Sequence, residues 1–571
     1  MGPTLPISQE IHASKYRLEG ESFYEAMCRI AAALADGDDH RRSFKDILLD
    51  MRFMPAGRVQ CAMGSPRETT AYNCFVSGTI DDSMTSIMHR ATQAAETMRR
   101  GGGIGYDFSR LRPRGDLIKS LDSRSSGPIS FMGIFDSVCK TISSAGHRRG
   151  AQMGVLRIDH PDVEEFIQAK NNSTTLTGFN VSLGITDRFM ECLLAGEKFP
   201  LEFEGKVYRY INPAALWDKV MRSTWDWAEP GVLFIDRINE MNNLYYCEKI
   251  AATNPCGEQP LPPFGACLLG SFNLVRYVKT QQDGTRYFDA EQFKRDIYPV
   301  VRAMDNVVDR TIYPLPEQEQ EAKAKRRMGL GITALANAAE ALGYPYGSPR
   351  FIEFEREVLR TLMNGTYRAS TMLAKEKGAF PLYNASAYLG GQFVQKLDGD
   401  VISDIVFHGI RNSHLTSIAP TGTISLCADN VSSGVEPVFS HFYDRTIQTF
   451  DGPKVERVED YGYRMFGVKG RTADAIDARE HVAVLAEAQK WVDSAVSKTC
   501  NVGDQVTFDQ FKDLYTEGWK AGCKGMTTFR ASGKRFGILN APTTAKEEEP
   551  EEPVAMACTF DPETGRKTCD Q

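Results

Sequence analysis

The sequence predicts an α/β fold with parallel strands, and three observations carry that prediction. Amphipathic helical patterns with start and stop signals recur along the 571 residues. Short apolar runs, each the length of a buried strand, lie between them. Helices and strands therefore alternate, as they do in βαβ units. The predicted helices cover residues 18–36, 213–228, 351–378 and 478–499, and the predicted strands include residues 72–76, 179–183, 266–269 and 415–418.

Two of these helices have clear boundaries in the sequence. Ser22 can cap the first helix. Four apolar residues then fall on one face of it, namely Phe23, Met27, Ile30 and Leu34. Pro213 suits the first turn of the second helix, and the Glu-Pro-Gly sequence at residues 229–231 stops it.

Polar and glycine-rich segments connect the elements. Residues 99–107 lack the Gly-Lys-Ser/Thr ending of a P-loop, so their glycines indicate only close backbone approach. Residues 143–151 and 170–178 are polar loops. Residues 419–425 form a hydroxyl-rich turn after a strand. If a helix begins there, its free N–H groups and positive dipole end would make an anion site, although an ordinary connection capped by threonine is also consistent with the sequence.

Residues 254–271 hold two cysteines, one carboxylate and the amide of Asn254 in a segment stiffened by four prolines. Cys256 and Cys267 could be small buried hydrophobes, an interpretation that suits Cys267 taken singly. Asn254 and Glu258 lie two residues before and after Cys256. In an extended segment these three side chains would leave the same face. A thiol, a carboxylate and an amide on one face indicate a catalytic arrangement.

Composition narrows the class of protein. The net charge of −7 is spread along the chain, which argues against a nucleic-acid or membrane-surface binder. No apolar run approaches the ~18 residues of a membrane span, and the N-terminus lacks the pattern of a secretory signal. The 13 scattered cysteines include no C-x-x-C and no zinc spacing. We expect a cytoplasmic protein with redox-active thiols and no metal site.

The C-terminal residues differ in composition from the rest. From residue 541 the chain is acidic and proline-bearing, as a flexible linker is, and it ends with Cys558 and Cys569 close to the terminus. Two cysteines on a tether suit thiol–disulfide exchange with a buried site. The alternative is a pair of incidental exposed thiols.

The Asn-x-Cys-x-Glu motif at residues 254–258, with a second cysteine 11 residues after the first, resembles the finger loop of ribonucleotide reductases. The spacing is that of the adenosylcobalamin-dependent class II enzymes, and further family segments recur in order between about residues 50 and 535. The resemblance implies a ten-stranded α/β barrel of two five-stranded parallel halves around a central finger loop, at residues 56–540. A small N-terminal helical region would occupy residues 1–55, and a flexible acidic linker with a redox-cysteine tail residues 541–571.

The resemblance also implies roles for individual residues. Cys256 would become a thiyl radical, Glu258 would act as a base and Asn254 would bind the substrate by a hydrogen bond. Cys74 and Cys267 would end as a disulfide, which Cys558 and Cys569 would reduce. The implied substrate-binding residues are Asn73, Pro420, Thr421, Gly422, Thr423 and Ile424. The implied effector-binding residues are Asp82, Arg148 and Lys170. Without the resemblance, Cys74 would be a buried strand cysteine and Asp82 a plain helix cap.

The activity implied is reduction of ribonucleotides to 2′-deoxyribonucleotides for DNA synthesis, with adenosylcobalamin as the radical source. A deoxynucleotide or ATP effector would control substrate specificity, thioredoxin or a similar reductant would restore the tail, and the family makes a homodimer an option. In class I reductases, tandem tyrosines occupy the place of Thr527, Thr528 and Phe529. None of these three residues has an oxidisable phenol, which favours class II.

Two alternatives follow from the same residues. One is a class I large subunit that depends on a separate radical subunit. The other is a catalytically inactive nucleotide-binding regulator, against which the complete set of Asn254, Cys256, Glu258 and two disulfide partners argues. A zinc-thiolate protein is a more distant option, because the ligand spacing is absent.

Overall fold

The computed structural model describes residues 2–118, 122–145, 151–172, 174–449, 452–530, 532–534, 559–561 and 566–568. Its largest sheet has eight strands in the order β13-β2-β3-β6-β7-β10-β21-β20. Five consecutive members of this sheet are parallel to one another. They are β2 (Cys74–Val76), β3 (Gly103–Asp107), β6 (Gln152–Arg157), β7 (Phe179–Ile185) and β10 (Gly231–Phe234).

The two ends of this parallel set meet antiparallel strands. β13 (Ala266–Cys267) pairs with β2, and β21 (Gly525–Phe529) pairs with β10. β20 (Thr499–Asn501) then runs parallel to β21. The antiparallel partners therefore flank a five-stranded parallel core.

A second sheet has three strands, β1 (Phe53–Pro55), β14 (Leu269–Asn273) and β17 (Gly329–Thr333). β14 and β17 are parallel, and two isolated bridges continue from them, joining Leu330 to Thr416 and Ile418 to Val496. The predicted α/β class with parallel strands is confirmed. The hydrogen-bonded sheets do not close on each other, so a closed ten-stranded barrel is not confirmed.

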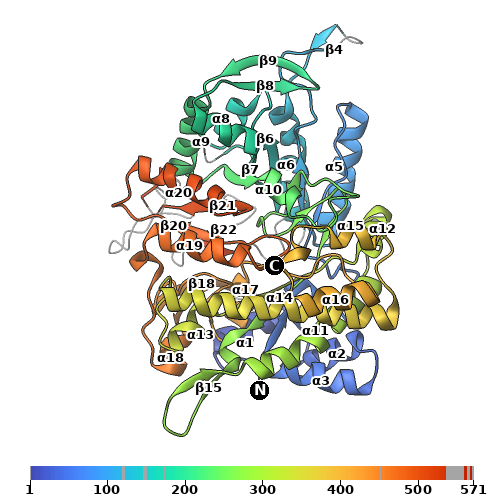
Figure 1. The fold of residues 1–571 in the computed structure, drawn as a ribbon, viewed down its shortest axis with the longest axis vertical. Helices are drawn as coiled ribbons and strands as arrows, with labels where there is room; N and C mark the ends of the chain where they lie inside the picture. Colours follow the sequence, from blue (N-terminus) through green and yellow to red (C-terminus); the bar gives the residue numbers. More distant parts are fainter. Residues whose placement is uncertain are drawn as a thin grey trace.

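Helices connect successive parallel strands, as the alternation in the sequence predicts (Figure 1). In chain order they are α4 (Gly57–Ala62), α5 (Met84–Arg99), α6 (Pro128–Ala145), α7 (Val163–Gln168), α8 (Asp187–Ala195), α9 (Pro213–Trp227), α10 (Ile235–Glu240), α11 (Ala290–Arg310), α12 (Pro316–Lys325), α13 (Leu335–Ala341), α14 (Pro349–Lys377), α15 (Ala385–Leu389), α16 (Gly399–His408), α17 (Gly422–Cys427), α18 (Tyr461–Phe466), α19 (Ala478–Gln489) and α20 (Phe508–Lys520). Short 3-10 helices lie at Leu274–Tyr277, Val394–Lys396 and Ala473–Ala475.

Two-stranded ribbons make up the remaining β structure. The strand pairs are β4 (Leu117–Ile118) with β5 (Ser123–Arg124), β8 (Phe199–Phe203) with β9 (Lys206–Ile211), β11 (Ala252–Thr253) with β12 (Pro260–Leu261), β15 (Val278–Thr280) with β16 (Arg286–Phe288), β18 (Phe442–Thr449) with β19 (Gly452–Glu459), and β22 (Thr559–Asp561) with β23 (Arg566–Thr568). The β11–β12 ribbon carries the predicted catalytic segment.

The buried apolar side chains form two separate clusters. The large outer cluster joins the helices to the outward faces of the strands. The small inner cluster contains Cys74, Val76 and Cys267 together with residues of β6, β10 and the β11–β12 ribbon. Phe75, between Cys74 and Val76, belongs to the outer cluster, as strand alternation requires. Both faces of the strands are therefore buried, and the β11–β12 ribbon lies against the inner one.

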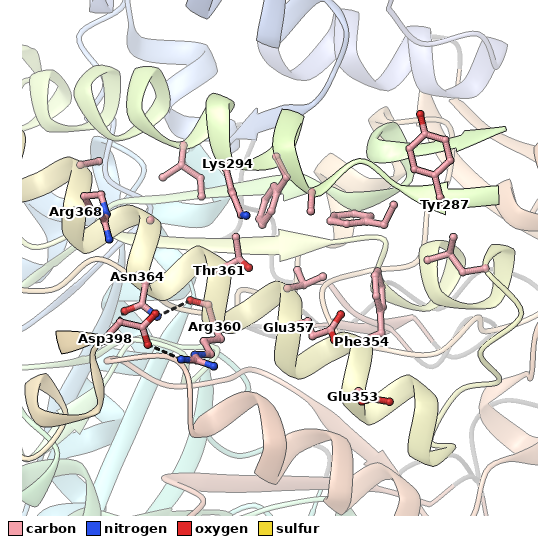
Figure 2. A pocket seen from close by; sticks show the side chains of 18 of the residues that line it. Tyr287, Lys294, Glu353, Phe354, Glu357, Arg360, Thr361, Asn364, Arg368 and Asp398 are labelled. Carbon is pink, nitrogen blue, oxygen red and sulfur yellow. Dashed lines mark hydrogen bonds and ion pairs between the residues drawn. The ribbon is translucent and has the colours of Figure 1, made fainter. Parts of the chain in front are cut away.

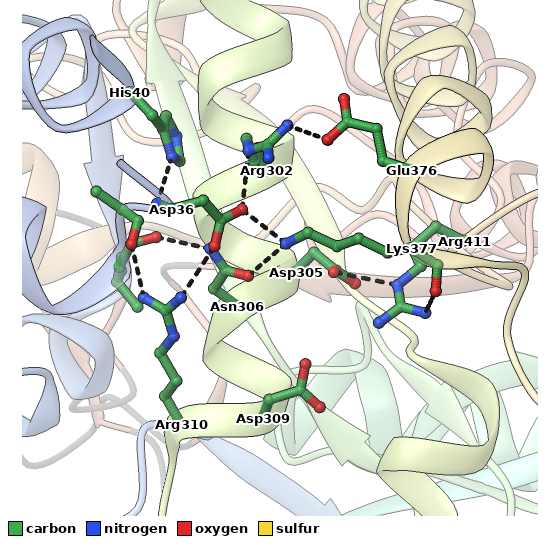
Figure 3. Close-up of polar contacts among 12 residues, drawn as sticks. Asp36, His40, Arg302, Asp305, Asn306, Asp309, Arg310, Glu376, Lys377 and Arg411 are labelled. Carbon is green, nitrogen blue, oxygen red and sulfur yellow. Dashed lines mark hydrogen bonds and ion pairs between the residues drawn. The ribbon is translucent and has the colours of Figure 1, made fainter. Parts of the chain in front are cut away.

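An N-terminal helical region packs against α11 at the lower end of the view in Figure 1. It consists of α1 (Pro6–Tyr16), α2 (Phe23–Leu34) and α3 (Asp38–Leu49). Asp36, directly after α2, accepts bonds from Arg302 at 2.8 Å and Lys377 at 2.7 Å (Figure 3). Burial alone would raise the pKa of Asp36, but Lys377, Arg302 and Asn306 outweigh burial and lower it. These ion pairs connect the N-terminal helical region to α11 and α14. The domain boundary near residue 55 stays a prediction.

Helix boundaries agree with the sequence where a local signal exists. Ser22 caps α2 in a capping box with Glu25, and α9 begins at Pro213. The prediction of a helix over 478–499 was wrong at its end, because α19 stops at Gln489. Asp493 is buried and its carboxylate accepts from the Leu415 and Thr416 N–H groups, so tertiary contacts draw this segment away from the helix axis.

Candidate active site at the finger hairpin

The finger hairpin, which we define as β11, the turn at residues 254–259 and β12, does not have the extended form predicted for it. The Gly257 N–H donates to the Asn254 carbonyl at 3.1 Å, and Gly257 has a φ of +82°. The Asn254 side-chain Oδ1 accepts the Gln259 N–H at 2.9 Å. Asn254, Cys256 and Glu258 therefore come together through a tight turn, whose left-handed glycine the alternation argument did not consider.

Glycines on two strands give this hairpin room. A Cβ on Gly105 of β3 would lie 1.9 Å from the Thr253 carbonyl oxygen, and one on Gly329 of β17 would lie 2.2 Å from the Gln259 side chain. The Asn180 side chain donates to the Pro255 carbonyl at 3.1 Å. The glycine-rich segment at residues 99–107 thus provides the close backbone approach that its composition predicts.

The second half of the chain holds the other side of the turn. The Glu258 carbonyl accepts the Ala495 N–H at 2.9 Å and the Ser417 hydroxyl at 2.9 Å. Segments from both sheets therefore fix the turn, and its side chains have little freedom to move.

Two cysteines face each other next to this turn. Cys74 on β2 and Cys267 on β13 are direct antiparallel partners, and both are reduced and buried. Such partners have Cα atoms about 4.5–5.5 Å apart, within the range of about 4.4–6.8 Å that a disulfide spans. The backbone therefore allows this pair to form a disulfide with little movement.

Burial and the charge of Glu258 keep both thiols protonated. They raise the pKa of Cys74 to about 12, although contacts with Asn254 and the Gly103 N–H act in the opposite direction. The pKa of Cys267 is also raised, first by burial and then by Glu258, Cys74 and Cys256. The three thiols and the carboxylate are thus within electrostatic reach of one another. The paired cysteines are suited to donating protons rather than to acting as thiolates.

Buried amides with unused hydrogen-bonding atoms surround the thiols. Neither amide atom of Asn73 has a hydrogen-bond partner among the described residues, and the same holds for Gln259. The Asn254 Nδ2 makes no hydrogen bond of ordinary geometry in this part of the chain, yet it lies close enough to Cys74 to lower the pKa of that thiol. Leaving such groups unpaired costs free energy, so they are typical of a site that binds a polar ligand. Gln259 was missed by sequence reasoning, although it directly follows Glu258.

A small cavity of about 60 Å³ adjoins Cys256. Its wall includes Ser182, Glu229 and Lys498, and Thr527 of β21 lies on it as well. Cys256 is 5% exposed. A group that reaches this cavity from the side of β21 would meet the Cys256 sulfur without passing the Cys74–Cys267 pair.

The segment predicted to bind phosphate does precede a helix, since α17 begins at Gly422. Thr421 has a φ of +53°, and its hydroxyl is used internally, bonding with the Thr333 hydroxyl at 3.0 Å and accepting the Gly434 N–H at 2.8 Å. Any anion would therefore meet backbone N–H groups here rather than the Thr421 side chain. The roles of Pro420, Gly422, Thr423 and Ile424 stay predictions.

Two of the three predicted effector residues, Asp82 and Lys170, form ion pairs in the described part of the chain. Ser83, not Asp82, caps α5, and the Asp82 carboxylate pairs with Arg112 at 2.5 Å. The Lys170 ammonium pairs with Glu229 at 2.7 Å and also donates to the Phe179 carbonyl. Arg148, Cys558 and Cys569 lie outside the described residues.

A larger cavity of about 1070 Å³ lies between α11 and α14. Its wall carries Lys294 and Thr361, and Arg360 is paired there with Asp398 at 2.7 Å (Figure 2). No cysteine lines this cavity. It therefore lacks the redox groups that mark the finger hairpin.

Comparison with known proteins agrees with this arrangement. The family described as ribonucleotide reductase, barrel domain, matches residues 72–529. A vitamin B12-dependent ribonucleoside-diphosphate reductase from Mycobacterium tuberculosis is 34% identical over 560 residues, covering 91% of this chain and 78% of that protein. One from Thermoplasma acidophilum is 31% identical, with 97% and 75% covered. A ribonucleoside-diphosphate reductase subunit alpha from Chlamydia pneumoniae is 24% identical, with 89% and 56% covered.

Two further observations concern the whole chain. Among the helices in the described ranges, none combines the length and the apolar character that crossing a membrane requires. The family match spans the eight-stranded sheet, β14 and β17 of the second sheet and the finger hairpin, including Cys74, Asn254, Cys256, Glu258 and Cys267. This chain belongs to the ribonucleotide reductase family.

Proposed function

We propose that this chain reduces ribonucleotides to 2′-deoxyribonucleotides by a thiyl-radical mechanism, with adenosylcobalamin as the radical source. The observation that carries the proposal is the gathering of Cys256, Glu258 and the Cys74–Cys267 pair around the finger turn. The relatives from Mycobacterium tuberculosis and Thermoplasma acidophilum, both named as vitamin B12-dependent ribonucleoside-diphosphate reductases, support the cofactor and a diphosphate substrate.

In the proposed reaction, each group in the turn has one task. The Cys256 thiyl takes the hydrogen atom from C3′ of the ribose, while Glu258 takes the proton of the 3′-hydroxyl and Asn254 orients that side of the sugar. The bond from C2′ to its hydroxyl breaks, and a proton from the Cys74–Cys267 pair lets water leave. The pair then gives a hydrogen atom to C2′ and an electron to the 3′ carbonyl and so becomes a disulfide. Glu258 returns its proton to the 3′ oxygen, and Cys256 returns the hydrogen atom to C3′. One ribonucleotide and two thiols thus give one deoxyribonucleotide, one disulfide and one water.

The raised thiol pKa values fit this scheme. With a pKa of about 12, Cys74 is protonated at neutral pH and can supply the proton that the leaving hydroxyl needs. Burial also keeps dioxygen and dissolved reductants away from the radical, which they would otherwise quench. Asn73 and Gln259, with unused amide atoms, would hold the polar substrate.

The residues beside Cys256 fit the proposed cofactor. When bound, adenosylcobalamin supplies the radical that converts the Cys256 thiol to a thiyl. Ser182, Glu229 and Thr527 share the wall of the small cavity with Cys256 and would be the side chains nearest to a group that reacts with it. Thr527, Thr528 and Phe529 of β21 carry no oxidisable phenol, so this strand has no side chain that could relay a radical from a partner subunit.

The fold proposed with this function is the ten-stranded barrel of two five-stranded halves. Five parallel strands in one sheet support the first half. For the second half, support comes from β14, β17 and the two bridges that lead through Thr416 and Ile418 to Val496. The short interval between β13 and β14 supports a connection between the halves, because the chain passes from one sheet to the other across Leu268.

Regulation and reduction are proposed on the same basis. Asp82, Arg148 and Lys170 would bind a deoxynucleotide or ATP effector. Cys558 and Cys569 would reduce the Cys74–Cys267 disulfide by exchange, and thioredoxin or a similar protein would restore them. The pairing of Thr559 with Thr568 supports this role, because the two tail cysteines directly flank that pair in the sequence. A homodimer and a cytoplasmic location complete the proposal.

One assay tests the activity and separates the alternatives. The purified chain is given adenosylcobalamin, a small dithiol and each ribonucleoside di- or triphosphate in turn, and deoxynucleotide is measured. We expect product from this chain alone, and none without adenosylcobalamin. A class I large subunit would give product only after a separate radical subunit is added, and an inactive regulator would bind nucleotide but form none.

The tail proposal has its own test, in which Cys558→Ser is compared with Cys247→Ser. Cys247 is an exposed cysteine remote from the proposed chemistry. We expect Cys558→Ser to retain turnover with a small dithiol and to lose it with thioredoxin, while Cys247→Ser retains both. Equal loss with both reductants in Cys558→Ser would contradict the shuttle role.

A further inference from the structure

The base of the finger hairpin borders a cavity that has no part in the proposed reaction. Its volume is about 450 Å³, within the range of about 300–1000 Å³ that is typical of small-molecule sites. Its wall includes residues 249–252, Leu261 and Pro263, which lead into and out of the hairpin. The small cavity beside Cys256 adjoins the tip of the same hairpin, and the two cavities share no lining residue.

The five parallel strands of the large sheet all end at this cavity. Its lining contains the last residues of β2, β3 and β6, the last but one of β7 and the residue directly after β10, namely Val76, Asp107, Arg157, Gly184 and Ile235. In α/β proteins the crevice outside the carboxyl ends of parallel strands is the usual place for a ligand. The position of the cavity in the fold is therefore that of a binding site.

The buried part of the cavity wall is apolar. It consists of side chains that also belong to the inner cluster, namely Val76, Ile235, Ile250, Ala252 and Leu261. None of these is more than 8% exposed. Apolar side chains with a few polar groups around them are the usual lining of a site for an organic molecule.

The two carboxylates on the wall already have partners. The Asp107 carboxylate accepts the Ser109 N–H at 2.9 Å, and the Asp236 carboxylate accepts the Asp187 N–H at 2.8 Å. Burial raises the pKa of Asp107, although its bonds with Ser109 act in the opposite direction. Asp107 therefore gives up its proton less readily than an ordinary carboxyl, and the acidic groups attract a ligand only weakly.

The cations on the wall, in contrast, have unused donors. The Lys249 ammonium is exposed and makes no hydrogen bond or ion pair within the described residues. Arg110 pairs with Asp81 at 3.4 Å, and both side chains are exposed. Arg157 bonds with Asp159 through Nε and Nη2, which leaves its other N–H groups available. The charge that a ligand can use here is therefore positive.

We propose that this cavity binds a small organic anion with an apolar body, either an aromatic carboxylate or an aromatic phosphate monoester. The apolar body would lie on the inner cluster, and the anionic group would bond with Lys249, Arg110 or Arg157. The Asn239 side chain donates to the Ile250 carbonyl at 2.8 Å and accepts the Ile250 N–H at 2.8 Å, so the hairpin side of the wall is fixed to α10 before a ligand arrives. The proposal goes beyond ribonucleotide reduction and does not depend on it.

The test measures binding of three probes to the full chain by calorimetry. They are 1-naphthoate, 1-naphthyl phosphate and the uncharged 1-naphthylmethanol. We expect saturable binding of at least one anion, and at least about tenfold weaker binding of the alcohol, because only an anion forms charge-assisted bonds with the cations. The tighter of the two anions identifies the head group as carboxylate or phosphate, and either result supports the proposal.

Lys249→Ala compared with Lys375→Ala locates the anionic group. Lys375, on α14, is also an exposed lysine without a hydrogen bond or ion pair in the described part of the chain. Lys249→Ala should weaken binding of the anion about tenfold and leave binding of the alcohol unchanged. Lys375→Ala should change neither.

A second pair of variants tests the cavity itself. A Cβ on Gly184 would lie 3.8 Å from its nearest neighbours, an ordinary contact, so Gly184→Ala should stay within about threefold of the parent affinity. Gly184→Leu places a larger side chain in the cavity and should weaken anion binding at least about tenfold. Amide hydrogen exchange gives a further readout, since the bound anion should slow exchange of residues 249–252 in the parent chain and not in Gly184→Leu.

No saturable binding of either anion below about 1 mM would overturn the proposal. Equal losses in Lys249→Ala and Lys375→Ala would do so too, and so would full anion affinity in Gly184→Leu. Equal affinity for the alcohol and the anions would mean an apolar surface without anion recognition, which also rejects it. None of these measurements requires turnover, so a chain that forms no deoxynucleotide would contradict the proposed function and leave this result standing.

Discussion

Two pairs of buried cysteines in this protein look alike by themselves and differ only in their neighbours. Burial raises the pKa of Cys74 to about 12, and it does the same for Cys500 and Cys523. Cys500 contributes to the raised pKa of Cys523, so these two thiols also lie close together. The pairs therefore cannot be told apart by burial or by acidity.

Their surroundings separate them. Cys74 and Cys267 belong to the inner cluster with the finger hairpin, beside Glu258 and the unpaired amide of Asn73. Cys500 and Cys523 belong to the outer cluster, where helices cover the sheet. A carboxylate, a third thiol and unused hydrogen-bonding atoms thus distinguish the pair proposed to react, and burial alone does not. Four predictions test this difference.

The largest effect is expected at Cys256, the third thiol, which lies beside the Cys74–Cys267 pair. Cys256→Ser should reduce turnover by at least about 10³-fold, because a hydroxyl does not form the radical that takes the C3′ hydrogen. Cys500→Ala should stay within about threefold of the parent chain. Deoxynucleotide formation measures both, and nucleotide affinity is the control for folding. Comparable losses of turnover in Cys256→Ser and Cys500→Ala would contradict the proposed difference between the two cysteine pairs.

Disulfide formation should be confined to the inner pair. One round of turnover without reductant should join Cys74 to Cys267 and leave Cys500 and Cys523 as thiols, because only the first pair faces the substrate. Mass spectrometry after alkylation measures this. Cys267→Ala should lower multiple-turnover activity about 100-fold, whereas Cys523→Ala should change it by less than about threefold. A Cys500–Cys523 disulfide that depends on substrate would contradict the assignment.

A shift of the finger hairpin should affect the Cys74–Cys267 pair and leave the Cys500–Cys523 pair unchanged. Gly105→Ala would place a Cβ 1.9 Å from the Thr253 carbonyl oxygen, so the hairpin must shift, at a cost of about 2–4 kcal/mol in the free energy of unfolding. Gly133→Ala, in α6, meets no atom within 4 Å and should gain about 0.5–1 kcal/mol. Denaturant unfolding measures both changes.

The same variants have a second readout in thiol alkylation. Gly105→Ala should speed alkylation of Cys74 and Cys267 and leave Cys500 and Cys523 protected, whereas Gly133→Ala should alter neither pair. Equal exposure of both pairs in Gly105→Ala would mean that the hairpin supports the whole core and not only the inner cluster.

The smallest effect concerns pH and should be common to both pairs. A buried thiol with a pKa raised to about 12 makes its full contribution to stability at any pH below the unfolded-state pKa of about 8.5. As the pH rises above that value, the unfolded chain loses the proton first and stability falls, by up to about 1.4 kcal/mol per pH unit for each thiol. Denaturant unfolding between pH 8 and pH 10 measures this decline. Cys500→Ala should lessen it, and an unchanged slope would contradict the thiol contribution.

Local structure was largely predictable from the sequence. Ser22 and Glu25 form the capping box that begins α2, and Pro213 begins α9, because caps and prolines act on the backbone beside them. The α/β class followed from the alternation of elements. The end of α19 was not predictable, because the buried contacts of Asp493 with Leu415 and Thr416 join residues far apart in sequence.

The convergence of the proposed catalytic residues was predicted for a reason that was partly wrong. Asn254, Cys256 and Glu258 do converge near Cys74 and Cys267, but a turn at Gly257 brings them together and an extended strand does not. Gln259 was overlooked, since an amide next to a catalytic motif gives no signal until its buried, unpaired atoms are seen.

The sequence by itself determined the element types, the close approach of backbone to the glycines of β3, and the family, because these depend on short stretches of residues. Only the tertiary structure decided how the turn at Gly257 brings Asn254, Cys256 and Glu258 together, which cavity adjoins Cys256, and which strand ends meet the base of the finger hairpin. The contacts that hold these features in place join segments that lie tens to hundreds of residues apart. Their free energy comes from burial and hydrogen bonds that exist only after the chain has folded.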